Sequence, residues 1–146
     1  MNRKNTTELL LGDDVRAFYE QMDNGECKYK MLADDGSYYC RTVASPEGAW
    51  QNSHLHLHVT EHYLVQSGWI AYASLGNELT MLVQIITEGQ HIVVHPGVHH
   101  NLYMSANSVL HTIKYGKNTA SDWTASPELD RLTHPLTEYQ ILHQYS

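Results

Sequence analysis

Histidine is the residue type in this chain with the most chemical potential. The 146 residues contain 11 histidines, against 9 Lys+Arg and a single Phe. Histidine is the commonest metal ligand and the side chain that changes charge near neutral pH. His54, His56 and His58 alternate along one apolar run. Because alternate side chains of an extended strand share a face, these three are expected to point the same way.

A carboxylate and a fourth histidine follow that run closely, as Glu61 and His62. Two imidazoles two residues apart on one strand can reach a common metal ion. A strand with three histidines on one face is costly unless that face is wet or coordinated. The stretch therefore indicates a metal site on an extended segment.

The spacing of these residues resembles the first motif of the cupin superfamily. That motif runs Gly, five residues, His-x-His, three or four residues, Glu, six residues, Gly. Every interval is satisfied here, by Gly48, His54, His56, Glu61 and Gly68.

A second cupin motif follows about 20 residues later. It runs Gly, five residues, Pro-x-Gly, two residues, His, three residues, Asn. Gly89, Gly97 and His100 match, whereas His95 replaces the expected Pro and Met104 stands where Asn is expected. The resemblance covers roughly residues 28–115.

The resemblance implies one divalent metal held by His54, His56, Glu61 and His100. Three neutral imidazoles and a carboxylate suit Fe, Mn, Ni, Co, Cu or Zn, and four ligands leave two octahedral positions open for water, O₂ or substrate oxygens. Two alternatives stay open. The four side chains could form a metal-free polar cluster, or His56, His58 and His62 could bind in a shifted register that loses the Gly48 spacing.

Residues around this site are expected to move protons or shape a cavity. His58 and Tyr63 are the candidate catalytic residues. His95 and His99 flank the turn before His100, either at the cavity mouth or in solvent. Strand parity directs Tyr63 inward, together with four further side chains, some of them as plain barrel core: Trp50, Asn52, Leu102 and Met104.

The elements that must position the site are short strands. About eight extended runs, separated by turn signals at 8–12-residue spacing, lie between residues 28 and 115, which is typical of a sandwich or barrel. We expect an all-β jelly roll, or double-stranded β-helix, with short helices at both termini. The expected parts are a helical or extended segment at 1–26, the cupin barrel at 27–116 and a helical extension at 117–146.

Asp13 and Asp14 could cap the first helix, with Val15, Phe18, Tyr19 and Met22 on one face. Ser126-Pro127-Glu128 predicts the start of another, and residues 136–142 suggest a last one.

Composition excludes several function classes. A net charge of −7 and a pI near 5.8 argue against nucleic-acid binding. The sequence has no apolar run of the ~20 residues needed for a membrane span, and Leu9–Leu11 is too short for a secretory signal. Cys27 and Cys40 are not spaced as a redox or zinc pair. We therefore expect a cytoplasmic protein with no nucleic-acid or membrane partner.

Three functions fit these observations. The favoured one is a metal-dependent isomerase or epimerase of a small, sugar-like molecule, and the others are an Fe(II) dioxygenase and a non-catalytic cupin that binds a small molecule. The lean towards an isomerase comes from the family resemblance. Leu55, Leu57 and Val59 are expected on the outer face, so a homodimer with Leu55 and Leu57 near the contact is also expected. The alternative is that the N-terminal segment or the helix at residues 139–142 folds back over the same surface.

Overall fold

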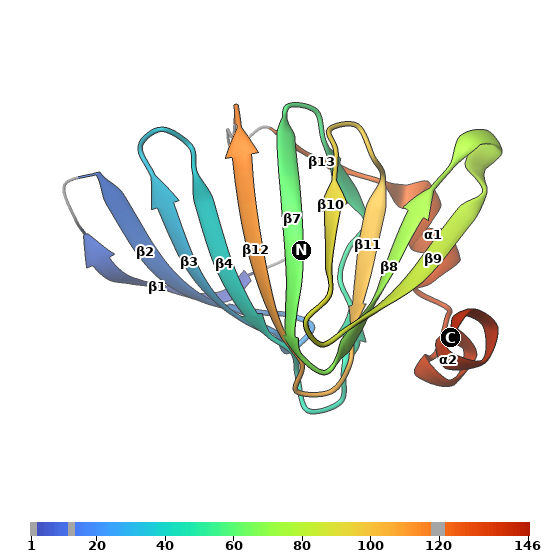
Figure 1. The fold of residues 1–146 in the computed structure, drawn as a ribbon. Helices are drawn as coiled ribbons and strands as arrows, with labels where there is room; N and C mark the ends of the chain where they lie inside the picture. Colours follow the sequence, from blue (N-terminus) through green and yellow to red (C-terminus); the bar gives the residue numbers. More distant parts are fainter. Residues whose placement is uncertain (1–2, 12–13, 118–121) are drawn as a thin grey trace.

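Two antiparallel β-sheets dominate the computed structural model, which describes residues 3–11, 14–117 and 122–146 (Figure 1). The seven-stranded sheet has, in spatial order, β1 (Arg3–Leu11), β2 (Val15–Met22), β3 (Cys27–Ala33), β4 (Tyr38–Val43), β12 (Val109–Gly116), β7 (Val59–Ser67) and β10 (His91–Val94). The six-stranded sheet has β13 (Trp123–Ala125), β6 (His54–His56), β11 (His100–Met104), β8 (Trp69–Leu75) and β9 (Met81–Thr87), with β5 (Ala49–Trp50) paired to β11. The predicted all-β class is confirmed.

The N-terminal segment corrects one prediction. Val15–Met22 is a strand and not a helix, because it pairs along its whole length with β3 on one side and β1 on the other. Two sets of inter-strand hydrogen bonds outweigh a helical spacing of only four apolar residues. The proposed capping residue Asp13 lies outside the described residues. The expected flanking helices are therefore found at the C-terminal end alone.

The main core lies between the sheets and is built from inward-facing alternate positions. On β7 the residues at 59, 61, 63 and 65 are buried, while Leu64 and Gln66 are exposed. Leu102 and Met104 of β11 belong to this core, as predicted. Tyr63 also points inward, as predicted, and packs in the same cluster.

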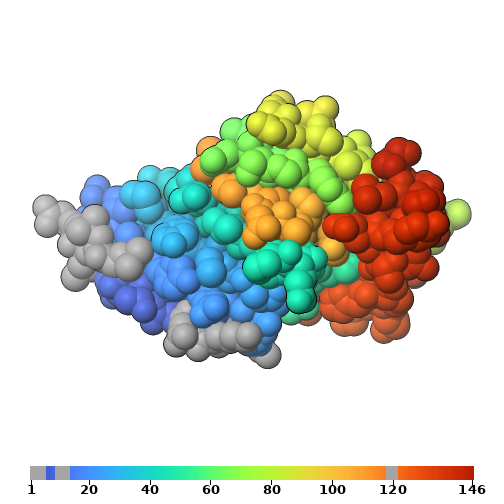
Figure 2. All heavy atoms as spheres, turned by 90° about the horizontal axis from the view of Figure 1, so that it is seen from below, coloured from blue at the N-terminus to red at the C-terminus, as the bar shows by residue number. Residues whose placement is uncertain are grey.

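The predicted C-terminal helices are both present, as α1 (Pro127–Thr133) and α2 (Glu138–Tyr145). Pro127 opens α1, and Thr137 with Gln140 forms a capping box at the start of α2. Ile141 is fully buried in a second cluster on the outer face of the six-stranded sheet, together with Tyr103 and Ala71. Figure 2 shows these helices as a layer at one end of the molecule, with the N-terminal strands at the other. The extension thus covers apolar sheet surface that would otherwise be exposed.

Two motif glycines have positions that a side chain would not fit. Gly48 has φ +74°, and a Cβ there would lie 2.8 Å from the Met104 carbonyl oxygen. Gly68 has φ +76° in the tight connection from β7 to β8, and its Cβ would lie 2.7 Å from that of Ser108. Glycine adopts positive φ without the cost paid by other residues. Across the described ranges, no helix is long and apolar enough to span a membrane.

Candidate metal centre

Three strands from both sheets bring the predicted ligands together. His54 and His56 lie on β6, Glu61 on β7 and His100 on β11, where His100 is paired with His54. Their exposed fractions are 8%, 5%, 2% and 1%, respectively. The barrel therefore places three imidazoles and a carboxylate in its interior, away from bulk water.

The chain bends directly after His56, and this bend corrects the expected parity. Leu57 and His58 lie in the bend, both with exposed side chains, and β7 begins at Val59 with an inward, 1% exposed side chain. The predictions that His58 shares the face of His54 and that Val59 points outward are therefore wrong. Alternation holds only along a continuous strand, and the bend resets it.

The Nε2 atoms of all three histidines face one oxygen of Glu61. Nε2 of His56 lies 2.9 Å from Glu61 Oε1, Nε2 of His100 3.2 Å and Nε2 of His54 3.9 Å. Ligand atoms of His54, Glu61 and His100 all lie within 4.8 Å of one another. His56 joins this group through its short distance to the carboxylate.

The other ring nitrogen of each histidine fixes the position of the proton. Nδ1 lies 3.0 Å from the Asn52 carbonyl oxygen in His54, 3.1 Å from that of Asp122 in His56, and 2.9 Å from that of Val98 in His100. A carbonyl only accepts, so each Nδ1 carries the hydrogen and each neutral ring presents an Nε2 lone pair. Three lone pairs therefore converge on a carboxylate oxygen.

Electrostatics keeps two of these groups in their metal-binding states. Burial, reinforced by the nearby His100, holds the pKa of His54 well below 6.5 and so keeps the ring neutral. Burial alone would raise the pKa of Glu61. The Lys114 ammonium opposes this effect, and the pKa of Glu61 lies well below 4.5.

The residues present fit a divalent transition metal. His56 Nε2 and Glu61 Oε1 are fully buried and have no hydrogen-bond partner among the described residues. Buried polar atoms without a partner are rare in folded proteins because they lose hydration without compensation. A cation shared by the three nitrogens and the carboxylate would satisfy both atoms, and the N₃O donor set suits the metals from Mn to Zn.

Tyr63 orients the carboxylate from within the barrel. Its hydroxyl donates to Glu61 Oε2 at 2.8 Å and lies 3.3 Å from His100 Nε2. Burial, followed by the charge of Glu61, raises the pKa of Tyr63 well above its usual range. The hydroxyl thus remains protonated and leaves Glu61 Oε1 to the histidines.

Two residues of the C-terminal extension belong to the site and were not predicted. Asp122 is 3% exposed. Its backbone carbonyl accepts the Nδ1 hydrogen of His56, and its carboxylate accepts the Leu57 and His58 backbone N–H groups at 2.7 Å and 3.2 Å. Trp123 stacks on His54, with ring centroids 5.4 Å apart. Neither residue lies in a motif, and only the pairing of β13 with β6 brings them here.

The remaining histidines lie elsewhere. His62 points away from Glu61 and contacts the Tyr115 hydroxyl at 3.0 Å, so the structure does not assemble the shifted register. His95 is exposed in the turn after β10. His99 is half-buried, with Nδ1 2.7 Å from the Ser126 hydroxyl, which ties the turn to the start of α1.

Trp50 also departs from its prediction. It lies on the outer face of the six-stranded sheet, edge-on to Tyr103, and donates its indole N–H to the Leu136 carbonyl at 3.0 Å. Residues 51–53 separate β5 from β6 and are not a strand, so the inward parity of His54 does not extend back to Trp50. Asn52 does line the cavity.

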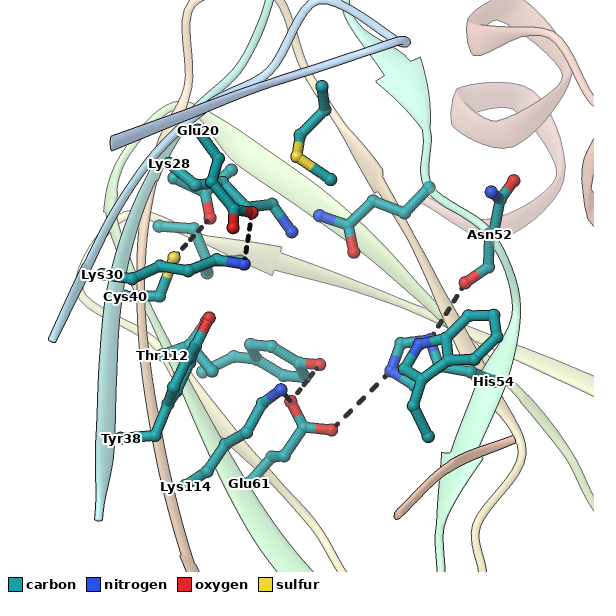
Figure 3. Close-up of a pocket in the computed structure, with 16 residues that line it drawn as sticks. Glu20, Lys28, Lys30, Tyr38, Cys40, Asn52, His54, Glu61, Thr112 and Lys114 are labelled. Atoms are coloured by element: carbon teal, nitrogen blue, oxygen red, sulfur yellow. Dashed lines mark hydrogen bonds and ion pairs between the residues drawn. The ribbon is translucent and has the colours of Figure 1, made fainter. Parts of the chain in front are cut away.

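A cavity of about 390 Å³ lies between the sheets and opens onto His54 and Glu61 (Figure 3). This volume is in the range of small-molecule sites, roughly 300–1,000 Å³. Its wall is mostly polar, and Trp123 contributes an aromatic surface. Two of the predicted metal ligands, His54 and Glu61, therefore border a space large enough for a small organic molecule.

Comparison with solved structures identifies the architecture. Oxalate decarboxylase from Bacillus subtilis superimposes with a TM-score of 0.63 at 12% identity, over 92% of this chain and 37% of that one. An oxalate oxidase in complex with the substrate analogue glycolate gives 0.59 at 16% identity, over 84% and 66%. The capsular polysaccharide assembling protein CapF from Staphylococcus aureus gives 0.58 at 15%, over 75% and 32%.

The chain has the cupin fold. It spans about a third of the length of CapF and of the decarboxylase. A second structure of the Bacillus decarboxylase is described by its Mn(II) centres. No protein-family model matches the sequence, and no curated protein matches it.

Proposed function

We propose that this cupin is a metal-dependent enzyme acting on a small oxygenated molecule. The observation that carries the proposal is the convergence of three Nε2 lone pairs on Glu61 Oε1 beside a cavity of about 390 Å³. A divalent metal bound there would supply Lewis acidity to a carbonyl or hydroxyl oxygen of the substrate. Oxalate decarboxylase and oxalate oxidase, which share the fold, are named for reactions of a small oxygenated acid.

Within this class we favour an isomerase or epimerase, and the chain's own residues suggest how it would move protons. His58 is exposed outside the cavity, and the Tyr63 hydroxyl is committed to Glu61. The cavity wall itself carries an acid–base pair. It consists of Lys30 and Glu20, whose Nζ and Oε2 atoms lie 2.6 Å apart. We assign proton transfer to this pair and the orientation of Glu61 to Tyr63.

An Fe(II) dioxygenase is the second candidate. Four protein ligands leave two octahedral positions for a substrate and O₂ together, and one structure with the same fold is an oxalate oxidase.

The two free cysteines, Cys27 and Cys40, fit a reducing compartment. We therefore retain the cytoplasm as the proposed location.

Metal content tests the core of the proposal. Protein purified without chelator should hold close to one transition metal per chain by elemental analysis. His56→Ala and Glu61→Ala should each hold well below one, because the remaining ligands lose their orientation. His62→Ala, whose ring faces outward, is the matched control and should retain its metal. Full retention in His56→Ala would refute the site, and loss confined to His62→Ala would support the shifted register.

The identity of the metal then separates the two candidate reactions. Iron with substrate-dependent O₂ uptake would support the dioxygenase. Manganese or zinc without O₂ uptake would support the isomerase or epimerase. A protein that holds an ordered organic ligand without metal would instead support a non-catalytic binding role.

A further inference from the structure

Lysines are concentrated in the cavity although the chain as a whole is acidic. The net charge is −7, and only five lysines occur in 146 residues. Three of them, Lys28, Lys30 and Lys114, line the cavity. Lys28 and Lys30 come from β3 and Lys114 from β12, all at inward positions of the seven-stranded sheet. Long cationic side chains normally lie in solvent, so this inward placement is informative.

The three ammonium groups differ in how they are paired. Lys30 is matched by Glu20, with 2.6 Å between Nζ and Oε2. Nζ of Lys28 lies 3.9 Å from Glu26 Oε1, and Nζ of Lys114 lies 4.0 Å from Glu61 Oε2. The last two distances are ion pairs without a hydrogen bond.

Lys28 and Lys114 therefore retain hydrogen-bond donors. An ammonium group has three N–H donors, and neither lysine donates a hydrogen bond to any residue in the described ranges. Lys114 also lies over the Tyr38 ring, 4.6 Å from its centroid, which holds the side chain across the wall. Only 16% and 18% of the two side chains are exposed. Figure 3 shows Lys28 with Lys30 on one wall, Lys114 beside Glu61, and His54 across the cavity.

The charge balance of this region is incomplete once a metal is bound. The three lysines and the three glutamates that face them cancel, and the histidines contribute no charge when they bind metal. Counting the buried Asp122 carboxylate behind His56, a divalent cation then leaves one positive charge in excess in a largely buried space. Excess charge of one sign in a low-dielectric cavity attracts a ligand of the opposite sign.

We propose that the cavity takes a small organic acid, with Lys114 and Lys28 binding its carboxylate oxygens while its other oxygen functions face His54 and Glu61. This inference rests on the proposed metal-dependent function and adds the class of substrate. Lys114, on β12, reaches the cavity beside Glu61, and Lys28 reaches it from the wall formed by β3. A neutral polyol or sugar could accept hydrogen bonds from these ammonium groups, but it would leave the positive charge of the cavity uncompensated.

Binding to matched probes tests the assignment. The first set of probes has six carbons: gluconate carries a carboxylate, glucose 6-phosphate a phosphate, and glucitol no charge. The second set repeats this comparison with three carbons, in glycerate, glycerol 3-phosphate and glycerol. Titration calorimetry on metal-loaded protein should show a carboxylate binding at least about tenfold more tightly than its neutral analogue. Lys28→Met and Lys114→Met should each weaken that binding by roughly tenfold, the effect of losing one charge-assisted contact.

Two further variants control for charge and folding. Lys117→Met removes the same charge from an exposed position after β12 and should bind as wild type does. Lys114→Arg keeps the charge and should bind more tightly than Lys114→Met. Circular dichroism and metal content confirm that each variant is folded and loaded.

The outcomes separate this inference from the proposed function. Wild-type protein that takes up no metal overturns the proposed function. Metal-loaded protein that binds the neutral probes as tightly as the acids, or binds none of the six, overturns the organic-acid assignment alone. Tighter binding of the phosphates than of the carboxylates overturns it in favour of a phosphorylated ligand.

Discussion

Asp122 offers the sharpest test of how the metal centre is built. Its carboxylate accepts the backbone N–H groups of Leu57 and His58, and its carbonyl accepts the Nδ1 hydrogen of His56. One buried residue therefore holds both the bend after β6 and the orientation of His56, a proposed metal ligand. We expect Asp122→Ala to lower both the stability of the fold and the affinity for metal.

The loss of stability follows from the carboxylate's bonds, whereas alanine keeps the carbonyl that accepts from His56, so metal affinity falls through release of the bend. Hydrogen bonds to a charged group contribute about 1.5–3 kcal/mol each. The contact from the Leu57 N–H is short, at 2.7 Å, and that from the His58 N–H is longer and shared between both carboxylate oxygens. A total loss of about 3 kcal/mol is expected, a large part of the 5–15 kcal/mol typical of a domain. Residues that orient a metal ligand change affinity by about 10–100-fold when removed.

Two assays measure these losses separately. Urea unfolding of chelator-treated protein, followed by circular dichroism, gives the free energy of unfolding. Competition with a calibrated chelator gives the metal affinity. Asp35→Ala is the matched control, because Asp35 also accepts a backbone N–H, from Ser37 at 2.9 Å, but in an exposed turn. It should cost no more than about 1 kcal/mol and leave metal affinity unchanged. An Asp122→Ala variant that matches this control in both assays would refute the reasoning.

Three further predictions concern pH, the C-terminal helix and assembly. His54 takes up a proton near pH 6.5 in the unfolded chain, whereas in the folded protein its pKa is lowered and the ring stays neutral. The unfolding free energy of metal-free protein should therefore decrease as the pH is lowered from 7 to 5, by at most about 1.4 kcal/mol per pH unit. The depressed pKa of Glu61 should add a further loss below about pH 4.5, and a urea midpoint that is flat from pH 7 to pH 4 would contradict both shifts. Ile141→Ala should cost about 2–5 kcal/mol in urea unfolding because the side chain is fully buried, while Leu142→Ala, at 36% exposure, should cost much less. We propose a homodimer in which Leu57, 56% exposed, lies near the contact; light scattering should show a dimer that Leu57→Glu dissociates, and a monomeric wild type would contradict it.

Much of the fold follows from local sequence signals. Most barrel strands from β3 to β12 are short and end at Gly, Pro or Asn turns, so they are visible in their own residues; the breaks that separate β5, β6 and β7 are the exception. The helix at Pro127 has its start signal in three adjacent residues. β1, β2 and β13 were missed because nothing local distinguishes them. Each is a strand through its partner, β13 through β6 and β2 through β3.

The same distinction separates the parts of the site that could be predicted from those that could not. His54, His56, Glu61 and His100 stand at the spacings of the two cupin motifs, so the resemblance to that family implies their convergence without the tertiary structure. His58 does not share the face of His54 and His56, because a bend fixed by Asp122, 64 residues away along the chain, interrupts the strand. The cavity lysines escaped notice for a related reason. They lie on β3 and β12, whose alternation shows which side chains share a face but not that this face looks onto the histidines of the opposite sheet. A motif can therefore indicate the proposed metal ligands, whereas the proposed choice of substrate rests on side chains that only the packing of the two sheets brings into reach.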